Sequence, residues 1–201
     1  MSETIDISRI DQIISERLEA LLPQKLAEIE QNRTPSMTII ATKGTLDWAY
    51  PQFILASTAA ALGWYVSVFF TFYGLQLLRK DLSHLKVSPL GNPGMPMKMP
   101  FGPKWFRGIN WNIPNVVQAA IPGFESLATA LMKQTITNSG VAQVEELRSL
   151  SLEAGVNLIG CQMTVDLFGF THDDFIPEVK EYCGAATFLP MAKDADVSLF
   201  I

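Results

Sequence analysis

Residues 48–78 read WAYPQFILASTAAALGWYVSVFFTFYGLQLL and contain no charged side chain. A run of this length and apolarity resembles a membrane span. Its internal pattern argues otherwise, because Gln52–Leu62 is rich in alanine, Gly63 is a natural helix stop, and Tyr65–Phe70 is β-branched and aromatic. Strands that are buried on both faces read as continuous apolar runs. The stretch therefore predicts a buried helix followed by a buried strand, with a membrane-anchored protein as the alternative.

The flanking segments extend this pattern into an α/β domain. Met37–Thr42, MTIIAT, is a short apolar strand, so that strand, helix and strand follow at the spacing of a right-handed parallel crossover. Further helices are predicted at Gly123–Asn138, Gln143–Ala154, Gln162–Phe168 and Asp173–Val179, and further strands at Val156–Cys161, Ala186–Leu189 and Val197–Ile201. The domain is expected to span residues 37–201 and to contain five strands.

The N-terminal residues 1–33 are predicted to form a separate amphipathic helix. Apolar residues recur at helical spacing between charged ones, at Ile7, Ile10, Ile14, Leu18, Leu21 and Leu22. We expect an interruption near Pro23, because a proline ring is poorly accommodated in a helix interior. The apolar stripe is expected to dock on the domain or on a second subunit. The helix has no basic start followed by an apolar core, so it does not resemble a secretory signal.

A stretch rich in Pro, Gly and Met lies at about residues 87–122 and is centred on GNPGMPMKMPFGPKWF. Connections of this length in a compact domain are usually lids, binding loops or interfaces. Met95, Met97 and Met99 are soft ligands of the kind that bind Cu(I), but methionine more often covers irregular apolar surfaces. No metal site is therefore predicted.

Composition restricts the class of function. The 201 residues are 48% hydrophobic and carry a net charge of -5, which fits one buried core. Nucleic acid is excluded as a partner because Lys and Arg are scattered. No GxGxxG or GxxxxGK[ST] motif is present, so no nucleotide cofactor is expected. Two cysteines without an export signal indicate a reducing compartment, and we expect a cytoplasmic protein.

In open α/β sheets, ligands bind outside the carboxyl ends of the strands. The residues that directly follow the strands are Thr42, Lys43 and Gly44; Thr71, Phe72, Tyr73 and Gly74; and Gly160, Cys161 and Gln162. Cys161 ends a strand and begins a helix, where unpaired amides and the helix dipole favour a thiolate. The alternative is that Cys161 is a small buried hydrophobic residue.

The other candidate groups are less specific. Lys43 is a possible electrostatic partner of the thiolate, or a solvated loop lysine. Cys183 is predicted to fill space, with a resolving disulfide to Cys161 as the minor alternative. The two cysteines lack CxxC spacing, and the two histidines, His84 and His172, lie far apart in the sequence, so neither a zinc site nor a catalytic Cys-His pair is supported.

Five motifs in order resemble the DsrE/DsrF/DrsH-like superfamily, in its longer branch from sulfur-oxidising prokaryotes. They are ATKGTLDWAYPQFILASTAAALG, FFTFYGL, GNPGMPM, GCQMTVDLFGF and GAATFL, within residues 37–201. The resemblance implies a three-layer α/β/α fold with a largely parallel five-stranded sheet, a homo-oligomer, and sulfur transfer through a persulfide or thiosulfonate on one cysteine. In this chain the role falls to Cys161, with Thr42, Lys43, Gly44, Thr71, Tyr73, Gly160 and Gln162 as candidate substrate-binding residues.

The resemblance also implies partners, namely a TusA-like sulfur carrier and a rhodanese that feed cytoplasmic sulfur oxidation. The expected function is that of a sulfur carrier or sulfurtransferase that uses no metal or organic cofactor. A second interpretation is a non-catalytic interaction subunit, in which the N-terminal helix and the Met-rich stretch form a protein interface. Replacement of Cys161 distinguishes the two, because an interface does not need the thiol.

Overall fold

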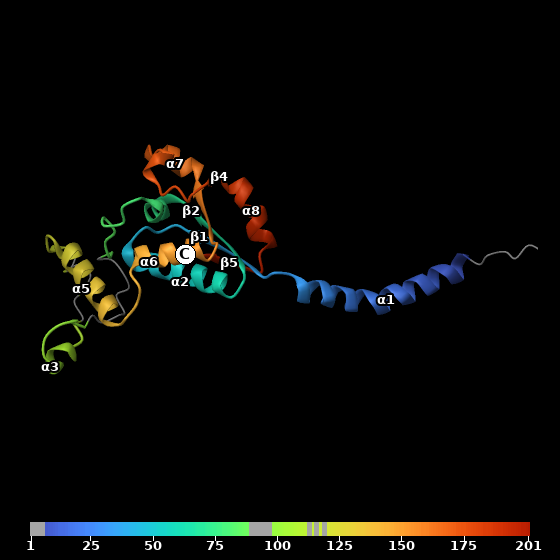
Figure 1. Cartoon of the computed structure of the whole chain (residues 1–201), viewed down its shortest axis with the longest axis horizontal. Coiled ribbons are helices and arrows are strands. Elements are labelled where there is room, and N and C mark those ends of the chain that lie inside the picture. Colours follow the sequence, from blue (N-terminus) through green and yellow to red (C-terminus); the bar gives the residue numbers. More distant parts are fainter. Residues whose placement is uncertain (1–6, 89–97, 112–113, 115–116, 118–119) are drawn as a thin grey trace, which may run out of the picture. The chain divides into compact units, whose positions relative to one another are not determined.

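A computed structural model describes residues 7–88, 98–111, 114, 117 and 120–201 (Figure 1). The chain divides into two compact units, Met1–Thr34 and Pro35–Ile201. The first unit contains α1 (Ile7–Asn32). The second contains β1 (Ser36–Ala41), α2 (Leu46–Ala61), β2 (Tyr65–Phe70), the 3-10 helix η1 (Phe72–Leu78), α3 (Lys104–Arg107), α5 (Phe124–Asn138), α6 (Val144–Glu153), β3 (Asn157–Cys161), α7 (Gln162–Phe168), the 3-10 helix η2 (His172–Asp174), β4 (Glu181–Cys183), α8 (Ala185–Asp194) and β5 (Val197–Phe200).

The five strands form one sheet in the order β4-β3-β2-β1-β5, and every neighbouring pair is parallel. The central strand β2 pairs with β1 through Val68 and Ile39, and with β3 through Val68 and Leu158. Parallel strands need crossover connections, and here these are supplied by the helices. The predicted α/β class with a parallel five-stranded sheet is confirmed.

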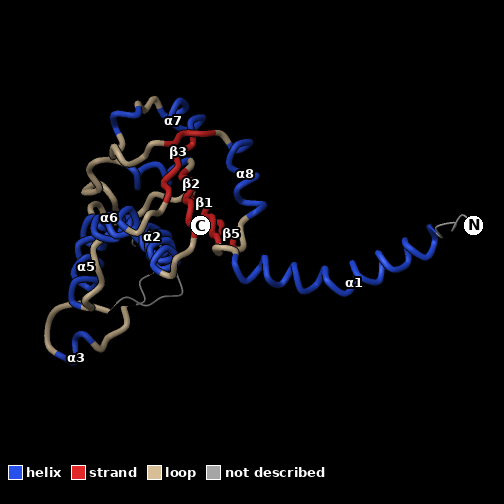
Figure 2. Tube along the Cα trace, turned by 45° about the vertical axis from the view of Figure 1, so that its right-hand side comes forward, coloured by secondary structure: helices blue, strands red, loops and turns tan. Residues whose placement is uncertain are grey.

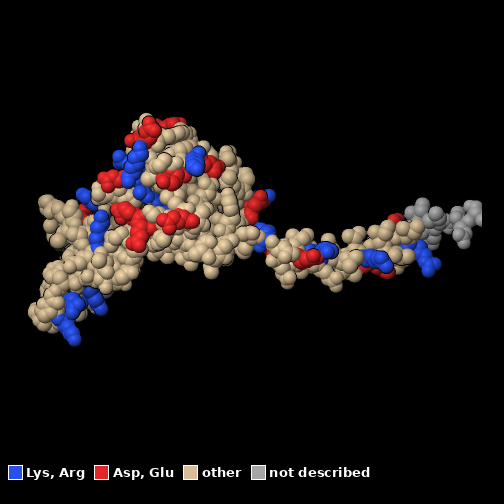
Figure 3. Space-filling model, viewed as in Figure 1, with Lys and Arg blue, Asp and Glu red and all other residues tan. Residues whose placement is uncertain are grey.

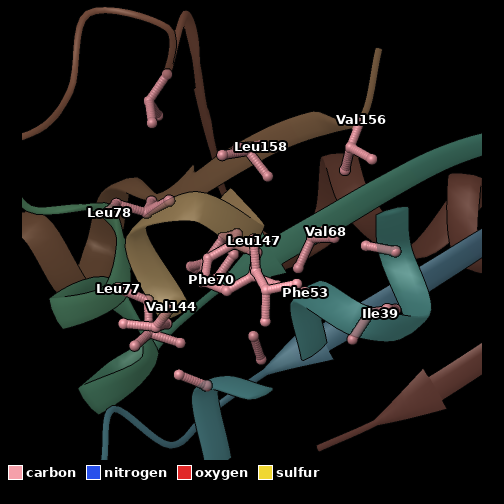
Figure 4. Close-up of a cluster of buried hydrophobic side chains, with 14 of the residues drawn as sticks. Ile39, Phe53, Val68, Phe70, Leu77, Leu78, Val144, Leu147, Val156 and Leu158 are labelled. Carbon is pink, nitrogen blue, oxygen red and sulfur yellow. The ribbon is translucent and has the colours of Figure 1, made fainter. Parts of the chain in front are cut away.

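Helices cover both faces of the sheet, which gives three layers (Figure 2). On one face, α2 and α6 pack against each other and against the strands, and residues such as Phe53, Phe70 and Leu147 form the main core (Figure 4). On the other face, α8 contributes Phe188 to a smaller cluster with Phe69. The rings of Phe69 and Phe188 stack with their centroids 4.6 Å apart.

The uncharged run of residues 48–78 forms α2, β2 and η1, as predicted for a buried helix and strand. Gly63, with φ of 84°, lies between α2 and β2 in a left-handed conformation that favours glycine. None of the helices in the described residues is both long and apolar enough to cross a membrane.

Three local predictions are wrong. Ala186–Leu189, predicted as a strand, belongs to α8, and the strand of this region is the preceding segment, β4. Asp173–Val179 contains only the end of the short η2, followed by non-helical chain. The helix α1 continues through Pro23. Its surface is exposed, so water can satisfy the carbonyl group that the proline leaves without a donor.

Candidate functional site at the carboxyl edge of the sheet

Cys161 is the last residue of β3 and the residue that caps the amino end of α7. Its backbone is extended, with φ of -77° and ψ of 108°, and the helix begins at the next residue. The first amides of a helix have no partner within the helix, so they and the helix dipole favour negative charge nearby. The predicted position of the thiol is thus confirmed. Cys161 as a whole residue is only 3% exposed, which means that neighbouring groups must move before a donor reaches the sulfur.

Thr71 and Thr164 connect the end of β2 to the helix that follows Cys161. Their hydroxyl groups lie 3.1 Å apart in a hydrogen bond, and the amide of Phe72 donates to the Thr164 hydroxyl at 3.4 Å. In the sheet, Phe70 pairs with Gly160, so Thr71 and Cys161 are the next residues on the two neighbouring strands. This places Thr71, a predicted site residue, beside the position of the thiol.

The loops that follow β1 and β2 are joined through their backbones. The amide of Thr71 donates to the carbonyl of Ala41 at 2.9 Å, and that of Gly74 donates to Thr42 at 3.1 Å. A Cβ atom at Gly74 would lie 2.2 Å from the Ala41 carbonyl oxygen, and one at Gly44 would lie 2.0 Å from the Tyr73 carbonyl oxygen. Both positions therefore require glycine, and the loops form one rigid edge.

Lys43 lies on this edge, and its ammonium group lies over the ring of Trp48. The Nζ atom lies 3.2 Å from the centroid of Trp48, which is the geometry of a cation–π interaction. The carbonyl group of Lys43 accepts a hydrogen bond from Gln52 at 3.3 Å. The hydroxyl group of Thr42 also has a partner, because it donates a hydrogen bond to the carbonyl group of Ile201 at 3.0 Å.

Gly160 and Gln162 face a second group of side chains. A Cβ atom at Gly160 would lie 2.7 Å from the Tyr182 ring, and that ring stacks on His172 with centroids 3.8 Å apart. The Nε2 atom of His172 lies 3.0 Å from the amide oxygen of Gln162, and the Gln162 amide nitrogen donates to Asp166 at 2.8 Å. Successive side chains of a strand alternate between faces, so Tyr182 lies across the sheet from Cys161.

Sequence reasoning missed Thr164, His172 and Tyr182. Thr164 carried a local signal, because it lies three residues after Cys161 on the first turn of a predicted helix. The contact between His172 and Tyr182 had no local signal in the sequence, because it depends on how β4 pairs with β3.

Exposed apolar side chains surround the carboxyl edge. Tyr73 stacks on Phe168 with centroids 6.0 Å apart, and the neighbouring Met163 and Leu167 are 63% and 64% exposed. Phe72 has φ of 47°, a left-handed conformation that is strained for a bulky residue, and it is 47% exposed. Strain of this kind is concentrated at functional sites.

Cys183, at the end of β4, is the register partner of Cys161. Both cysteines are free thiols, and Cys183 is 9% exposed. Burial raises the pKa of Cys183, and the negative charges of Glu181 and of an ionised Cys161 raise this pKa further.

Charged side chains and those of metal-ligating types are spread over the part of the chain that the structure describes. On the face shown in Figure 3, basic and acidic side chains are intermixed over the second unit. Within the described residues, no group of three or more His, Cys, Asp or Glu side chains is arranged to hold a metal ion. Met95 and Met97 lie outside the described residues, and Met99 is half-buried.

Comparison with known proteins supplies the family. Residues 33–200 match the model of the DsrE/DsrF/DrsH-like family. The sulfur carrier protein DsrE2 of Allochromatium vinosum is 56% identical over 165 residues, which cover 82% of this chain and 97% of that protein. The uncharacterised protein YrkE of Bacillus subtilis is 28% identical over 169 residues, 84% of this chain and 98% of that protein. The chain therefore belongs to the DsrE/DsrF/DrsH-like family.

Proposed function

We propose that this chain is a cytoplasmic sulfur carrier that holds a sulfane or thiosulfonate group on Cys161 and passes it to an acceptor thiol. The observation that carries the proposal is the place of Cys161, at the carboxyl end of β3 and the amino end of α7, in a chain 56% identical to a protein named as a sulfur carrier. Two free thiols fit a reducing compartment.

The reaction is an exchange at sulfur. The Cys161 thiolate attacks one sulfur of an S–S bond in the donor, a new S–S bond forms, and the other donor sulfur leaves with the electrons of the broken bond. In the second half of the cycle an acceptor thiolate attacks the outer sulfur and Cys161 leaves as a thiolate. Oxidation and reduction balance within each exchange, so no metal or organic cofactor is needed.

The surroundings of Cys161 support this role. Cys161 directly precedes the first turn of α7, and the edge built from Thr71, Gly74 and Gly44 is rigid. The exposed side chains of Tyr73, Met163 and Leu167 offer an apolar surface on which a protein acceptor can dock. We propose a TusA-like carrier or a rhodanese as that partner.

Intact-mass measurement after incubation with thiosulfate, tetrathionate or inorganic polysulfide tests the proposal. We expect an adduct on the peptide that contains Cys161, and none on the Cys161→Ser chain, because a hydroxyl group is a much poorer nucleophile and forms no stable persulfide. An adduct that survives in Cys161→Ser and maps to Cys183 would show that the wrong cysteine has been assigned.

The helix α1 supports a further part of the proposal, a homo-oligomer. Its large apolar side chains are 44–63% exposed, at Ile10, Ile13, Ile14, Leu18, Leu21, Leu22, Leu26 and Ile29. An amphipathic helix of 26 residues owes most of its stability to burial of such a stripe. We propose that α1 pairs with the same helix of a second copy. An interaction subunit without sulfur chemistry would share this helix but would not depend on Cys161.

A further inference from the structure

The two cysteines of the chain are direct neighbours in the sheet. The parallel register of β3 and β4 pairs Ile159 with Glu181 and Cys161 with Cys183. Partners in parallel strands place their side chains on the same face, with backbones about 4.8 Å apart. A disulfide joins residues whose Cα atoms are about 4.4 to 6.8 Å apart. The backbone spacing of this pair therefore falls within the range that a disulfide can span.

Both thiols also lie in the same apolar cluster, together with Phe69, Ile159 and Phe188. With exposed fractions of 3% for Cys161 and 9% for Cys183, external thiols reach either sulfur only after neighbouring groups move. Burial and the nearby charge of Glu181 raise the pKa of Cys183, and the negative charge of an ionised Cys161 raises it further. A sulfur atom held on Cys161 thus lies beside a second thiol of the same chain.

We propose that Cys183 is a resolving thiol that releases the sulfur held on Cys161 as sulfide, forming an internal disulfide. The proposal rests on the proposed function, since it requires a persulfide on Cys161. It gives the chain an activity beyond carriage, the reduction of sulfane sulfur by its own pair of thiols.

The step balances without an external oxidant. The Cys183 thiolate attacks Sγ of Cys161 in the persulfide, the Cys161–Cys183 bond forms, and the bond from Sγ to the terminal sulfur breaks. The terminal sulfur leaves as HS⁻ and has gained two electrons, which the two cysteine sulfurs have lost. A small dithiol then returns the disulfide to two thiols by exchange.

The environment of Cys183 slows this step. Its raised pKa leaves Cys183 mostly protonated at neutral pH, so it does not consume the adduct at once. Release is therefore expected to accelerate as the pH rises toward that pKa. Two titratable groups influence the charge near Cys183, namely Cys161 on β3 and Glu181 on the same strand, whereas the facing helix α8 contributes the apolar side chain of Phe188.

A single-turnover experiment tests the proposal in the full chain. The protein is loaded with inorganic polysulfide, freed of donor by desalting and incubated without added thiol, while sulfide and intact mass are followed. We expect the wild-type chain to release sulfide in proportion to its adduct and to finish lighter than the dithiol form by two hydrogen atoms. Peptide mapping should find Cys161 and Cys183 joined. Cys183→Ser and Cys183→Ala should retain the sulfur that they take up, with release slower by about tenfold or more.

Phe188→Leu is the matched control, because it disturbs the same cluster and keeps both thiols. It should still release sulfide. Equal release from the wild type and the Cys183 variants would overturn the proposal and leave the proposed function intact. Failure of the Cys183 variants to load at Cys161, while folded by circular dichroism, would instead argue against the proposed function. Titration of the unloaded chain with reduced and oxidised glutathione is an independent measurement, and absence of an internal disulfide at every ratio would also overturn the pairing.

Discussion

The hydroxyl groups of Thr71 and Thr164 share a hydrogen bond 3.1 Å long, which joins the end of β2 to the first turn of α7. Thr164 is fully buried, and its oxygen also accepts the amide of Phe72. One side chain thus holds the residue after β2 and the strained Phe72 against the helix that begins beside Cys161.

Thr164→Val keeps the shape of this side chain and removes the oxygen. We expect the free energy of unfolding to fall by about 1 to 2 kcal/mol, because the Thr71 hydroxyl and the Phe72 amide lose their partner in a half-buried setting. Urea denaturation measures the change. Thr187→Val, on the exposed surface of α8, is the control and should change stability by less than about 0.5 kcal/mol. Equal effects from the two variants would contradict the proposed link.

Gly74→Ala tests the close approach of the two loops. The added Cβ atom would meet the Ala41 carbonyl oxygen at 2.2 Å, so the backbone must shift, and we expect a loss of about 1 to 3 kcal/mol. Gly184→Ala is the matched control, since a Cβ atom there meets nothing within 4 Å and φ is -92°. Thermal unfolding of the two variants should separate them clearly. A stable Gly74→Ala chain would mean that the edge is less rigid than the structure indicates.

Lys43→Ala tests whether the positive charge beside Trp48 assists anionic donors. We expect slower loading by thiosulfate and tetrathionate, and a smaller effect on alkylation of Cys161 by a neutral reagent, because only the donors carry charge. Added salt should reduce the difference between the wild type and the variant. Lys180→Ala removes an exposed lysine before β4, at the opposite edge of the sheet, and serves as the control. Equal slowing of charged and neutral reagents would exclude an electrostatic role.

Alkaline pH is expected to destabilise the domain. Burial raises the pKa of Tyr182, and burial, Glu181 and Cys161 raise the pKa of Cys183. Each group binds its proton more tightly in the folded state than in the unfolded state. The resulting stability is fully present below the ordinary pKa values, about 8.5 for cysteine and 10 for tyrosine, and is lost as the pH rises through the raised values.

Urea denaturation at neutral and alkaline pH measures this dependence. The double variant Tyr182→Phe and Cys183→Ala removes both titrating groups and should lose less stability between the two pH values than the wild type. If the variant and the wild type lose the same amount, the alkaline sensitivity comes from other groups.

The apolar stripe of α1 is tested by two neighbouring substitutions. Leu21→Asp places a charge within the stripe and should shift the chain toward monomer in light scattering, because a carboxylate is costly to bury in a helix interface. Ala20 lies outside the stripe, because its neighbours three and four residues away along the helix are Glu16, Arg17, Pro23 and Gln24. Ala20→Asp should therefore leave the assembly unchanged. A chain whose mass in solution is the same for wild type, Leu21→Asp and a deletion of residues 1–33 would refute assembly through α1.

The local pattern of the sequence was sufficient to predict much of this fold. The strand Tyr65–Phe70 has the predicted bounds, because a strand buried on both faces must be apolar throughout. Cys161 was placed correctly at the junction of β3 and α7, because an apolar strand ending at Gly160-Cys161 is followed by a helix-forming segment. The motifs within residues 37–201 also identified the family that the comparison of residues 33–200 shows.

The tertiary structure decided the features that depend on strand pairing and on the direction of side chains. The segment Ala186–Leu189 has the side chains of a strand, but it packs as a helix because β4 ends at Cys183 and Phe188 covers the sheet. The position of the Lys43 ammonium group over Trp48 follows from the turn into α2, which spacing does not reveal. Cys161 and Cys183 lack any short motif and become neighbours only through the register of two parallel strands. The sequence determines which segments are apolar and regular, whereas contacts between distant segments depend on the packing of the whole sheet.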